Sequence, residues 1–122
     1  MLYFYILLVS CGSGLMAPDY PVAWLGEKVV DLGAIAKDSQ KQHVFQFRNI
    51  SDASLLIDNV RVGCGCTATD WETTTIAPGA VGSINVSYSA TNRGFFRKYI
   101  KVYFKQHRGG HKLWLEGFVE DR

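Results

Sequence analysis

Apolar and polar residues alternate with a period of two along most of this chain, from Val29 onward. Between Ser83 and Tyr88, for example, Ile84, Val86 and Tyr88 fall on one side of an extended chain and the polar residues fall on the other. This period is typical of a β-strand that buries one face. No convincing helical period competes with it, so we expect an all-β fold.

The clearest strands are expected at residues 29–32, 42–48, 55–62, 83–88, 99–105 and 113–119. Turn signals rich in Gly, Pro, Asn and Asp separate several of them, at residues 49–52, 77–79, 92–94 and 108–110. About seven short strands at this spacing predict a single immunoglobulin-like β-sandwich over residues 28–122. The chain has 122 residues, which is enough for one comfortable core but not for two. The side chains expected in that core include Phe45, Phe47, Ile84, Val86, Tyr88, Ile100, Val102, Phe104, Leu113, Leu115 and Val119.

The first residues of the chain are expected to direct its export and not to form part of the folded domain. Leu2 to Val9 form an uncharged apolar run, too short for a membrane-spanning helix of about 20 residues but long enough for a secretory signal. The run ends in Leu-Val-Ser-Cys, which resembles a bacterial lipobox. We expect a lipoprotein signal peptide at residues 1–10, lipidation of Cys11 and a lipidated tether at residues 11–27. The alternatives are a plain signal peptide and a stray hydrophobic start that is not a signal.

Several short motifs follow one another in the predicted domain. They are Asp31-Leu32-Gly33, Phe45-x-Phe47-x-Asn49, Gly63-Cys64-Gly65-Cys66-Thr67, Ile76-Ala77-Pro78-Gly79, Ile84-x-Val86-x-Tyr88, Gly94-Phe95-Phe96-x-Lys98, Ile100-x-Val102-Tyr103 and Leu113-x-Leu115-x-Gly117. From about Val29 to Val119 this series resembles the bacterial domain-of-unknown-function family fifteen-seventy-three. The resemblance implies an immunoglobulin-like fold similar to hydin-type domains and an exported protein, often a lipoprotein. It implies no known reaction.

Cys64 and Cys66 are separated by a single glycine. In a regular strand their side chains would point the same way, about 6.6 Å apart along the chain, whereas bonded cysteines have Cβ atoms about 3.8 Å apart. A disulfide therefore needs a local kink, which Gly65 permits because glycine tolerates a positive φ. Such a bridge would close a small, strained ring, and strained disulfides are easily reduced.

Three interpretations of this pair remain open. The two thiols can pack as small apolar side chains, or they can form a structural or redox disulfide in an oxidising compartment. They can also supply half of a metal site, completed by His43, His107 or His111, although none of these histidines stands at a telling spacing.

The last two predicted strands place aromatic and cationic residues on their solvent side. If Ile100, Val102 and Phe104 point inward, the residues between them point outward, and an antiparallel partner strand would add Trp114 and Phe118. The candidate partner surface is Tyr99, Lys101, Tyr103 and Trp114. Such residues concentrate binding energy in interfaces, whereas the alternative is ordinary cross-strand pairing on a silent surface.

Composition and motifs exclude several functions. The formal net charge of +2 is too small for a dedicated nucleic-acid binder. The chain has no G-x-S-x-G or H-E-x-x-H motif and no phosphate-binding glycine loop. Asp70 and Glu72 are expected in a loop without a deep cleft. No enzymatic activity and no cofactor are predicted.

The function predicted from these features is a non-catalytic lipoprotein domain of the bacterial cell envelope, in the periplasm or at the outer membrane. It would be held at the membrane by its lipid and bind an unidentified protein or glycan. The alternative is a metal-binding or redox accessory protein that uses the Cys-Gly-Cys pair.

Overall fold

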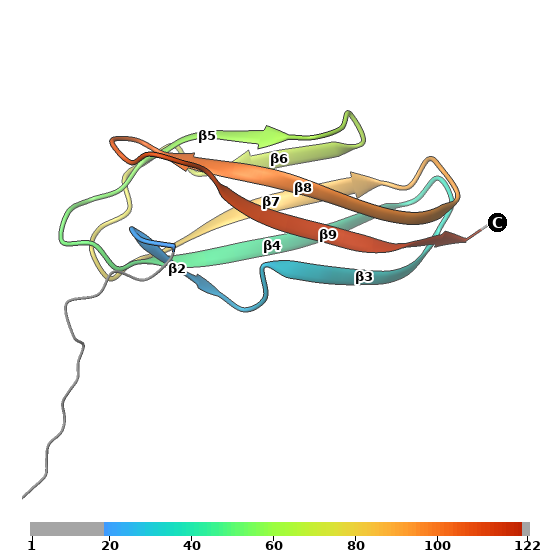
Figure 1. The fold of residues 1–122 in the computed structure, drawn as a ribbon, viewed down its shortest axis with the longest axis horizontal. Coiled ribbons are helices and arrows are strands. Elements are labelled where there is room, and N and C mark those ends of the chain that lie inside the picture. The colour runs from blue at the N-terminus through green and yellow to red at the C-terminus, as the bar shows by residue number, and fades with distance from the viewer. Residues whose placement is uncertain (1–18, 121–122) are drawn as a thin grey trace, which may run out of the picture.

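A computed structural model describes residues 19–120, which form two four-stranded β-sheets packed face to face (Figure 1). The first sheet has the strand order β2-β4-β7-β6 and the second has the order β3-β9-β8-β5. The strands are β2 (Val22–Leu25), β3 (Val29–Ala36), β4 (Gln40–Asn49), β5 (Ile57–Val62), β6 (Thr67–Trp71), β7 (Val81–Ser89), β8 (Gly94–Phe104) and β9 (His111–Glu120). Within residues 19–120 there is no helix long and apolar enough to cross a membrane.

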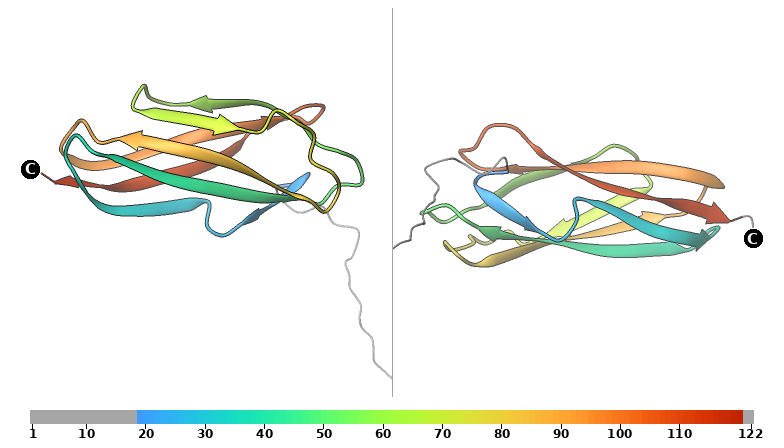
Figure 2. Two further views of the ribbon diagram at one scale, coloured as in Figure 1. Left: turned by 180° about the vertical axis from the view of Figure 1, so that it is seen from behind. Right: turned by 60° about the horizontal axis from the view of Figure 1, so that its bottom comes forward.

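The chain passes repeatedly from one sheet to the other, as the two views of Figure 2 show. It crosses between β2 and β3 at Gly26, where φ is +84°, and between β5 and β6 at the Cys-Gly-Cys turn. Neighbouring strands are antiparallel except for β3 and β9, which are parallel. The predicted immunoglobulin-like sandwich is therefore confirmed, with eight strands where about seven were expected.

The core lies between the two sheets and consists of the apolar side chains that alternate along the strands. The alternation is clearest in β7, where Ile84, Val86 and Tyr88 are at most 4% exposed. All the core residues expected from the sequence are buried, including Ile100 and Val102 of β8. Because burial of an apolar side chain contributes about 1.5–3 kcal/mol, this set accounts for much of the driving force for folding.

Two glycines allow parts of the backbone to approach side chains closely. A Cβ atom on Gly82 would lie 2.5 Å from Cζ of Phe47, and one on Gly117 would lie 2.8 Å from the carbonyl oxygen of Gly33. Gly33 itself belongs to the bulge of β3, where its backbone N–H donates to Asp31 Oδ1 over 2.8 Å. The Asp-Leu-Gly motif is thus a bulge that fits against Gly117.

Two short strands differ from the sequence-based expectation. Residues 22–25 were assigned to the tether, but they form β2, which pairs with the end of β4 and buries Val22 completely. Asp70 was expected in a loop, but it lies in β6. Both are short edge strands, and neither sequence alternates regularly: Val22–Leu25 (VAWL) is apolar throughout and Thr67–Trp71 (TATDW) is mostly polar.

Candidate functional site

The outward surface of the second sheet brings together side chains from three adjacent strands. The antiparallel register of β8 and β9 places Tyr99 opposite Trp114 and Lys101 opposite Lys112, and β5 places Arg61 opposite Lys101. We call this surface the aromatic–cationic face. It consists of Arg61, Arg97, Tyr99, Lys101, Tyr103, Lys112, Trp114 and Glu116.

Cations lie over each aromatic ring of this face. Arg97 Cζ is 4.4 Å from the ring centroid of Trp114, and Lys112 Nζ is 4.7 Å from that of Tyr99. The Tyr99 and Trp114 rings are 5.2 Å apart. Tyr103 has Arg61 at 5.6 Å and Lys101 at 5.7 Å. Each such contact contributes about 0.5–1 kcal/mol at an exposed site, so together they hold the long side chains against the sheet.

The face carries an excess of positive charge. Its acidic member is Glu116, whose carboxylate accepts a hydrogen bond from Arg97 in an exposed ion pair. Arg61, Lys101 and Lys112 contact aromatic rings and form no ion pair within residues 19–120, so no acidic side chain of this part of the chain compensates their charges. The surface is therefore suited to a ligand that carries negative charge.

An apolar pair extends the face at one end of β8 and β9. Phe95 and Phe118 are opposite each other in the register, with ring centroids 6.2 Å apart. Phe95 is 87% exposed and Phe118 is 48% exposed, which is unusual for such large apolar side chains. A hollow of about 340 Å³ beside Phe95 is also lined by Phe96, Arg97 and Glu116.

All four residues predicted for the partner surface lie on this face, and the prediction that Phe118 shares the outward side also holds. Tyr99, Lys101, Tyr103 and Trp114 are half-buried by their neighbours rather than fully exposed. The sequence analysis missed Arg61 and Lys112. The alternation of side chains along β9 could have placed Lys112 on the outward side, together with Trp114. Arg61 joins the face through the non-local pairing of β5 with β8, which the sequence pattern does not show.

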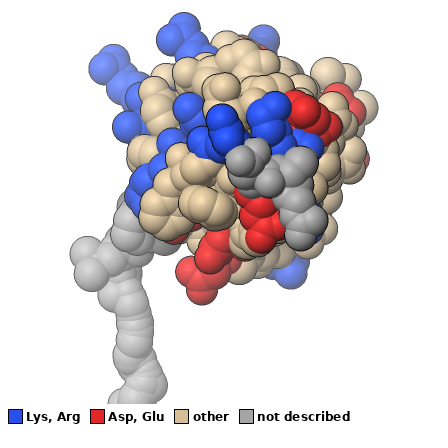
Figure 3. Space-filling view, turned by 90° about the vertical axis from the view of Figure 1, so that its right-hand side faces the viewer, with Lys and Arg blue, Asp and Glu red and all other residues tan. Residues whose placement is uncertain are grey.

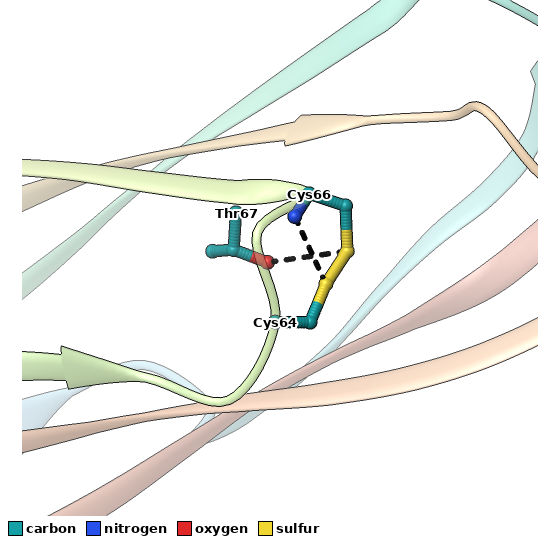
Figure 4. The surroundings of a disulfide bond; sticks show 3 residues. All are labelled: Cys64, Cys66 and Thr67. Carbon is teal, nitrogen blue, oxygen red and sulfur yellow. Dashed lines mark hydrogen bonds between the residues drawn. A yellow bond between two sulfur atoms is a disulfide. The ribbon is translucent and has the colours of Figure 1, made fainter.

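The second candidate site is the turn between β5 and β6, where a disulfide joins Cys64 and Cys66 (Figure 4). Their Cα atoms are 5.3 Å apart, so the turn departs from an extended strand as a bridge requires. The backbone N–H of Cys66 donates to Cys64 Sγ over 3.1 Å, and Thr67 N–H donates to the Cys64 carbonyl over 3.2 Å. Of the three interpretations of the pair, the structure shows the disulfide.

An open hollow of about 590 Å³ lies beside this disulfide at one end of the sandwich. Arg93, Arg97 and Lys98 line it together with both cysteines, whereas none of the three histidines considered for a metal site does so. Within residues 19–120, no group of three or more His, Cys, Asp or Glu side chains is placed to hold a metal ion. Figure 3 faces this end of the molecule and shows Lys and Arg side chains gathered on its upper part.

The predicted lipidation site, Cys11, lies outside the described residues, as do the signal peptide and the first part of the tether. Lipidation of Cys11 and export to the cell envelope therefore stay predictions from the sequence.

A family described as "Protein of unknown function (DUF1573)" matches residues 24–119. The chain belongs to this family. The resemblance stated from the sequence motifs is thus confirmed over nearly the whole described domain. Because DUF1573 is described as a family of unknown function, membership assigns neither a reaction nor a partner. No curated protein matches the chain significantly.

Solved structures support the fold of this DUF1573 domain. A PapD-like domain of human CEP192 matches with a TM-score of 0.66 and 8% identity, covering 97% of this chain and 99% of that one. A protein of unknown function from Porphyromonas gingivalis W83 has a TM-score of 0.67 and 12% identity, with coverage of 90% and 52%. The secreted serine protease VesC from Vibrio cholerae has a TM-score of 0.61 and 19% identity, with coverage of 84% and 24%.

These similarities show a shared immunoglobulin-like or PapD-like sandwich and nothing about activity, because identity is below one fifth in each case. The chain spans about a quarter of the VesC protease, so the likeness covers a minor part of that enzyme.

Proposed function

We propose that this DUF1573 domain is a non-catalytic binding domain of the bacterial cell envelope, and that its aromatic–cationic face binds a protein partner with an acidic surface. The observation that carries the proposal is the cluster of cations over Tyr99, Tyr103 and Trp114 on one continuous three-stranded surface. Tyr, Trp and Arg are the residue types that dominate binding energy in protein interfaces.

The positions of the cations favour an acidic partner. Lys112 and Arg97 lie against the rings of Tyr99 and Trp114, so those rings are not free to stack on a neutral sugar. Carboxylates of a partner would instead bind the cationic side chains. Because the aromatic rings already hold these side chains in place, less entropy is lost on binding. Electrostatic complementarity of this kind also raises the association rate.

The exposed phenylalanines favour a protein over an anionic glycan. Phe95 and Phe118 continue the face at its edge, and covering Phe95 requires an apolar group from the ligand. A protein surface offers apolar and acidic groups side by side, whereas an acidic polysaccharide presents mainly hydroxyl and carboxylate groups. A glycan is therefore the alternative that the experiment below distinguishes.

A non-catalytic role is supported by the absence from the sequence of the nucleophile and metalloprotease motifs considered above. The hollows beside the two candidate sites are open to solvent rather than enclosed like the pockets in which perturbed catalytic groups occur.

Anchoring at the membrane is the second part of the proposal. The apolar run of residues 2–9 and the Cys that follows it support lipidation of Cys11, and a disulfide is typical of an exported protein.

Changing Cys11→Ser is expected to abolish incorporation of radiolabelled palmitate and to release the protein from the membrane fraction. Unchanged labelling in the C11S variant would show that Cys11 is not the lipidated residue.

Site-specific cross-linking tests the binding face. A photoreactive phenylalanine analogue placed at Tyr103 in the full chain should cross-link an envelope protein in the producing cells. The matched control is the same analogue at Asn85, which is exposed on β7 of the other sheet. Introducing Trp114→Ala should reduce the cross-linked product at least about tenfold, as expected for an aromatic hot spot.

The alternatives give different results in the same experiment. Equal products from positions 103 and 85, or no cross-linked protein at all, would contradict the proposed face. The purified full chain is then tested for binding to polygalacturonate, an acidic polysaccharide. Binding to it without any protein cross-link would identify the ligand as a glycan and reject the protein partner.

A further inference from the structure

The Cys64–Cys66 disulfide contributes little to holding the elements of the fold together. Cys64 and Cys66 belong to one turn, so their bridge ties together no separate elements. The turn is already closed by the backbone hydrogen bond from Thr67 to the Cys64 carbonyl, and Ser89 N–H anchors it to β7 by donating to the Cys66 carbonyl over 2.8 Å. A bridge that adds so little connectivity, yet lies in an open hollow, is a candidate for chemistry.

We propose that the Cys64–Cys66 disulfide is a thiol–disulfide exchange site that reacts preferentially with thiols carrying negative charge. This activity goes beyond the proposed binding function and uses the disulfide hollow, which shares Arg97 and Phe95 with the binding face but not Tyr99, Tyr103 or Trp114. Both cysteines are partly buried and line the hollow at the end of the sandwich, so an external thiol can reach the bridge.

The charge preference follows from the residues that line the hollow. Arg93, Arg97 and Lys98 are the positively charged side chains among those that line it, and within residues 19–120 none of the lining side chains is acidic. Arg97 also pairs with Glu116 on the outward face, so its charge is partly compensated. Lys98 shares the core-facing side of β8 with Phe96 and Ile100 but is only partly buried. It therefore contributes positive charge beside the disulfide, and this charge raises the local concentration of anions there.

The hydrogen bonding of the turn indicates which sulfur leaves. The N–H of Cys66 donates to Cys64 Sγ over 3.1 Å, whereas the Thr67 hydroxyl lies 4.0 Å from Cys66 Sγ (Figure 4). The shorter of these two bonds stabilises a thiolate on Cys64 more strongly. An external thiolate is therefore expected to attack Cys66 Sγ. A bond forms between the external sulfur and Cys66, the Cys64–Cys66 bond breaks, and its electron pair stays on Cys64 as a thiolate.

A second external thiolate completes the reaction. It attacks the external sulfur of the mixed disulfide, the bond between that sulfur and Cys66 breaks, and its electron pair returns to Cys66. The two protein sulfurs then hold the two protons released by the external thiols. In sum, the protein disulfide and two thiols give a protein dithiol and one external disulfide, so the protein is reduced and the thiols are oxidised.

Exchange rates with charged thiols test the proposal. The oxidised full-length protein is treated separately with 2-mercaptoethanesulfonate, which is anionic, and cysteamine, which is cationic. Free Cys64 and Cys66 are then trapped by alkylation and quantified by peptide mass spectrometry. Each rate is divided by the rate of the same thiol with a short Cys-Gly-Cys disulfide peptide, which removes differences in intrinsic reactivity.

The wild-type protein is expected to favour the anionic thiol over the cationic one by about tenfold after this correction. Lys98→Gln should lose most of the preference. The matched control is Lys105→Gln, which removes one exposed charge at the opposite end of β8 and should leave the preference unchanged. The same rates are measured with peptides in which a cysteine is flanked by glutamates or by lysines. They show whether a thiol within an acidic peptide reacts as fast as 2-mercaptoethanesulfonate.

Two results would overturn the proposal. The first is a wild-type disulfide that neither thiol reduces at rates comparable to the free peptide. The second is an anion preference that Lys98→Gln leaves intact. Circular dichroism of each variant confirms that the sandwich is folded, so a change in preference can be assigned to charge. The partner-binding face is outside this experiment, and its cross-linking result stands independently.

Discussion

At the scale of single residues, several motif positions serve the fold rather than a ligand. The Asn49 side chain is 1% exposed, donates to the carbonyls of Ala53 and Ile76, and accepts from Ser51. Gly117 makes room for the bulge of β3. Motifs of this kind reveal the family and the architecture, but they say little about function because their side chains are occupied inside the protein.

Gly82 provides a direct test of core packing at this scale. Gly82→Ala should lower the free energy of unfolding by about 1–3 kcal/mol, because the new Cβ would overlap the Phe47 ring and displace Ile76. Denaturant unfolding measures the change. The control is Gly63→Ala, whose Cβ would meet the Tyr99 ring at an ordinary 3.5 Å and should change stability by less than about 0.5 kcal/mol. Equal effects of the two substitutions would contradict the described packing.

His111 is expected to make stability depend on pH. Burial is the main cause that lowers its pKa below 6.5, with Lys28 and His107 adding to the decrease and Asp19 opposing it. Its Nδ1 accepts a hydrogen bond from the Trp24 indole. A lowered pKa in the folded state means that the unfolded state binds protons first, so stability is fully present above pH 6.5 and falls as the pH decreases below that value.

The measurement compares thermal unfolding at about pH 7.5 and about pH 5.5. The wild-type protein should unfold at a lower temperature under the acidic condition, and His111→Gln should show a smaller difference. Part of the dependence should persist in that variant because burial also lowers the pKa of His43. A His111→Gln variant with the full wild-type dependence would exclude His111 as a source.

At the scale of strands and turns, alternation identified the long strands and missed the short ones. The parity of β7, β8 and β9 was assigned correctly, because each strand is long and has one side that is mostly buried. β2 and β6 have four and five residues and acquire their structure from pairing with β4 and β7. Such tertiary pairing overrides weak local patterns, and no residue within these two segments predicts it.

The disulfide turn gives a prediction at the same scale. The chain-entropy estimate for a loop with one intervening residue is only about 1.5 kcal/mol. Replacing both cysteines by serine should therefore lower the free energy of unfolding by no more than about 2 kcal/mol, without loss of the β-sheet circular dichroism spectrum. Denaturant unfolding of the double variant measures this. A loss above about 4 kcal/mol, or failure to fold, would show that the bridge is a structural element after all.

At the scale of the whole molecule, both candidate sites depend on how the two sheets are assembled. Arg61 reaches Tyr103 because β5 lies beside β8, and Lys98 and Cys64 line the same hollow because the β5–β6 turn crosses between the sheets at that end. Sequence parity could place Tyr99, Tyr103 and Trp114 on one side, but it contains no information on which distant strands become neighbours. The second sheet therefore supplies the part of each site that the sequence analysis did not predict.

The most direct test of this account is a nuclear Overhauser spectrum of the folded domain, read at the aromatic rings of the second sheet. We predict cross-peaks between the Tyr99 and Trp114 rings and between the Tyr103 ring and the Arg61 side chain. Trp114 should show none to the core ring of Phe104. Cross-peaks from Trp114 to Phe104, with none to Tyr99, would mean that β9 turns its other side to solvent, and the proposed binding face would not exist.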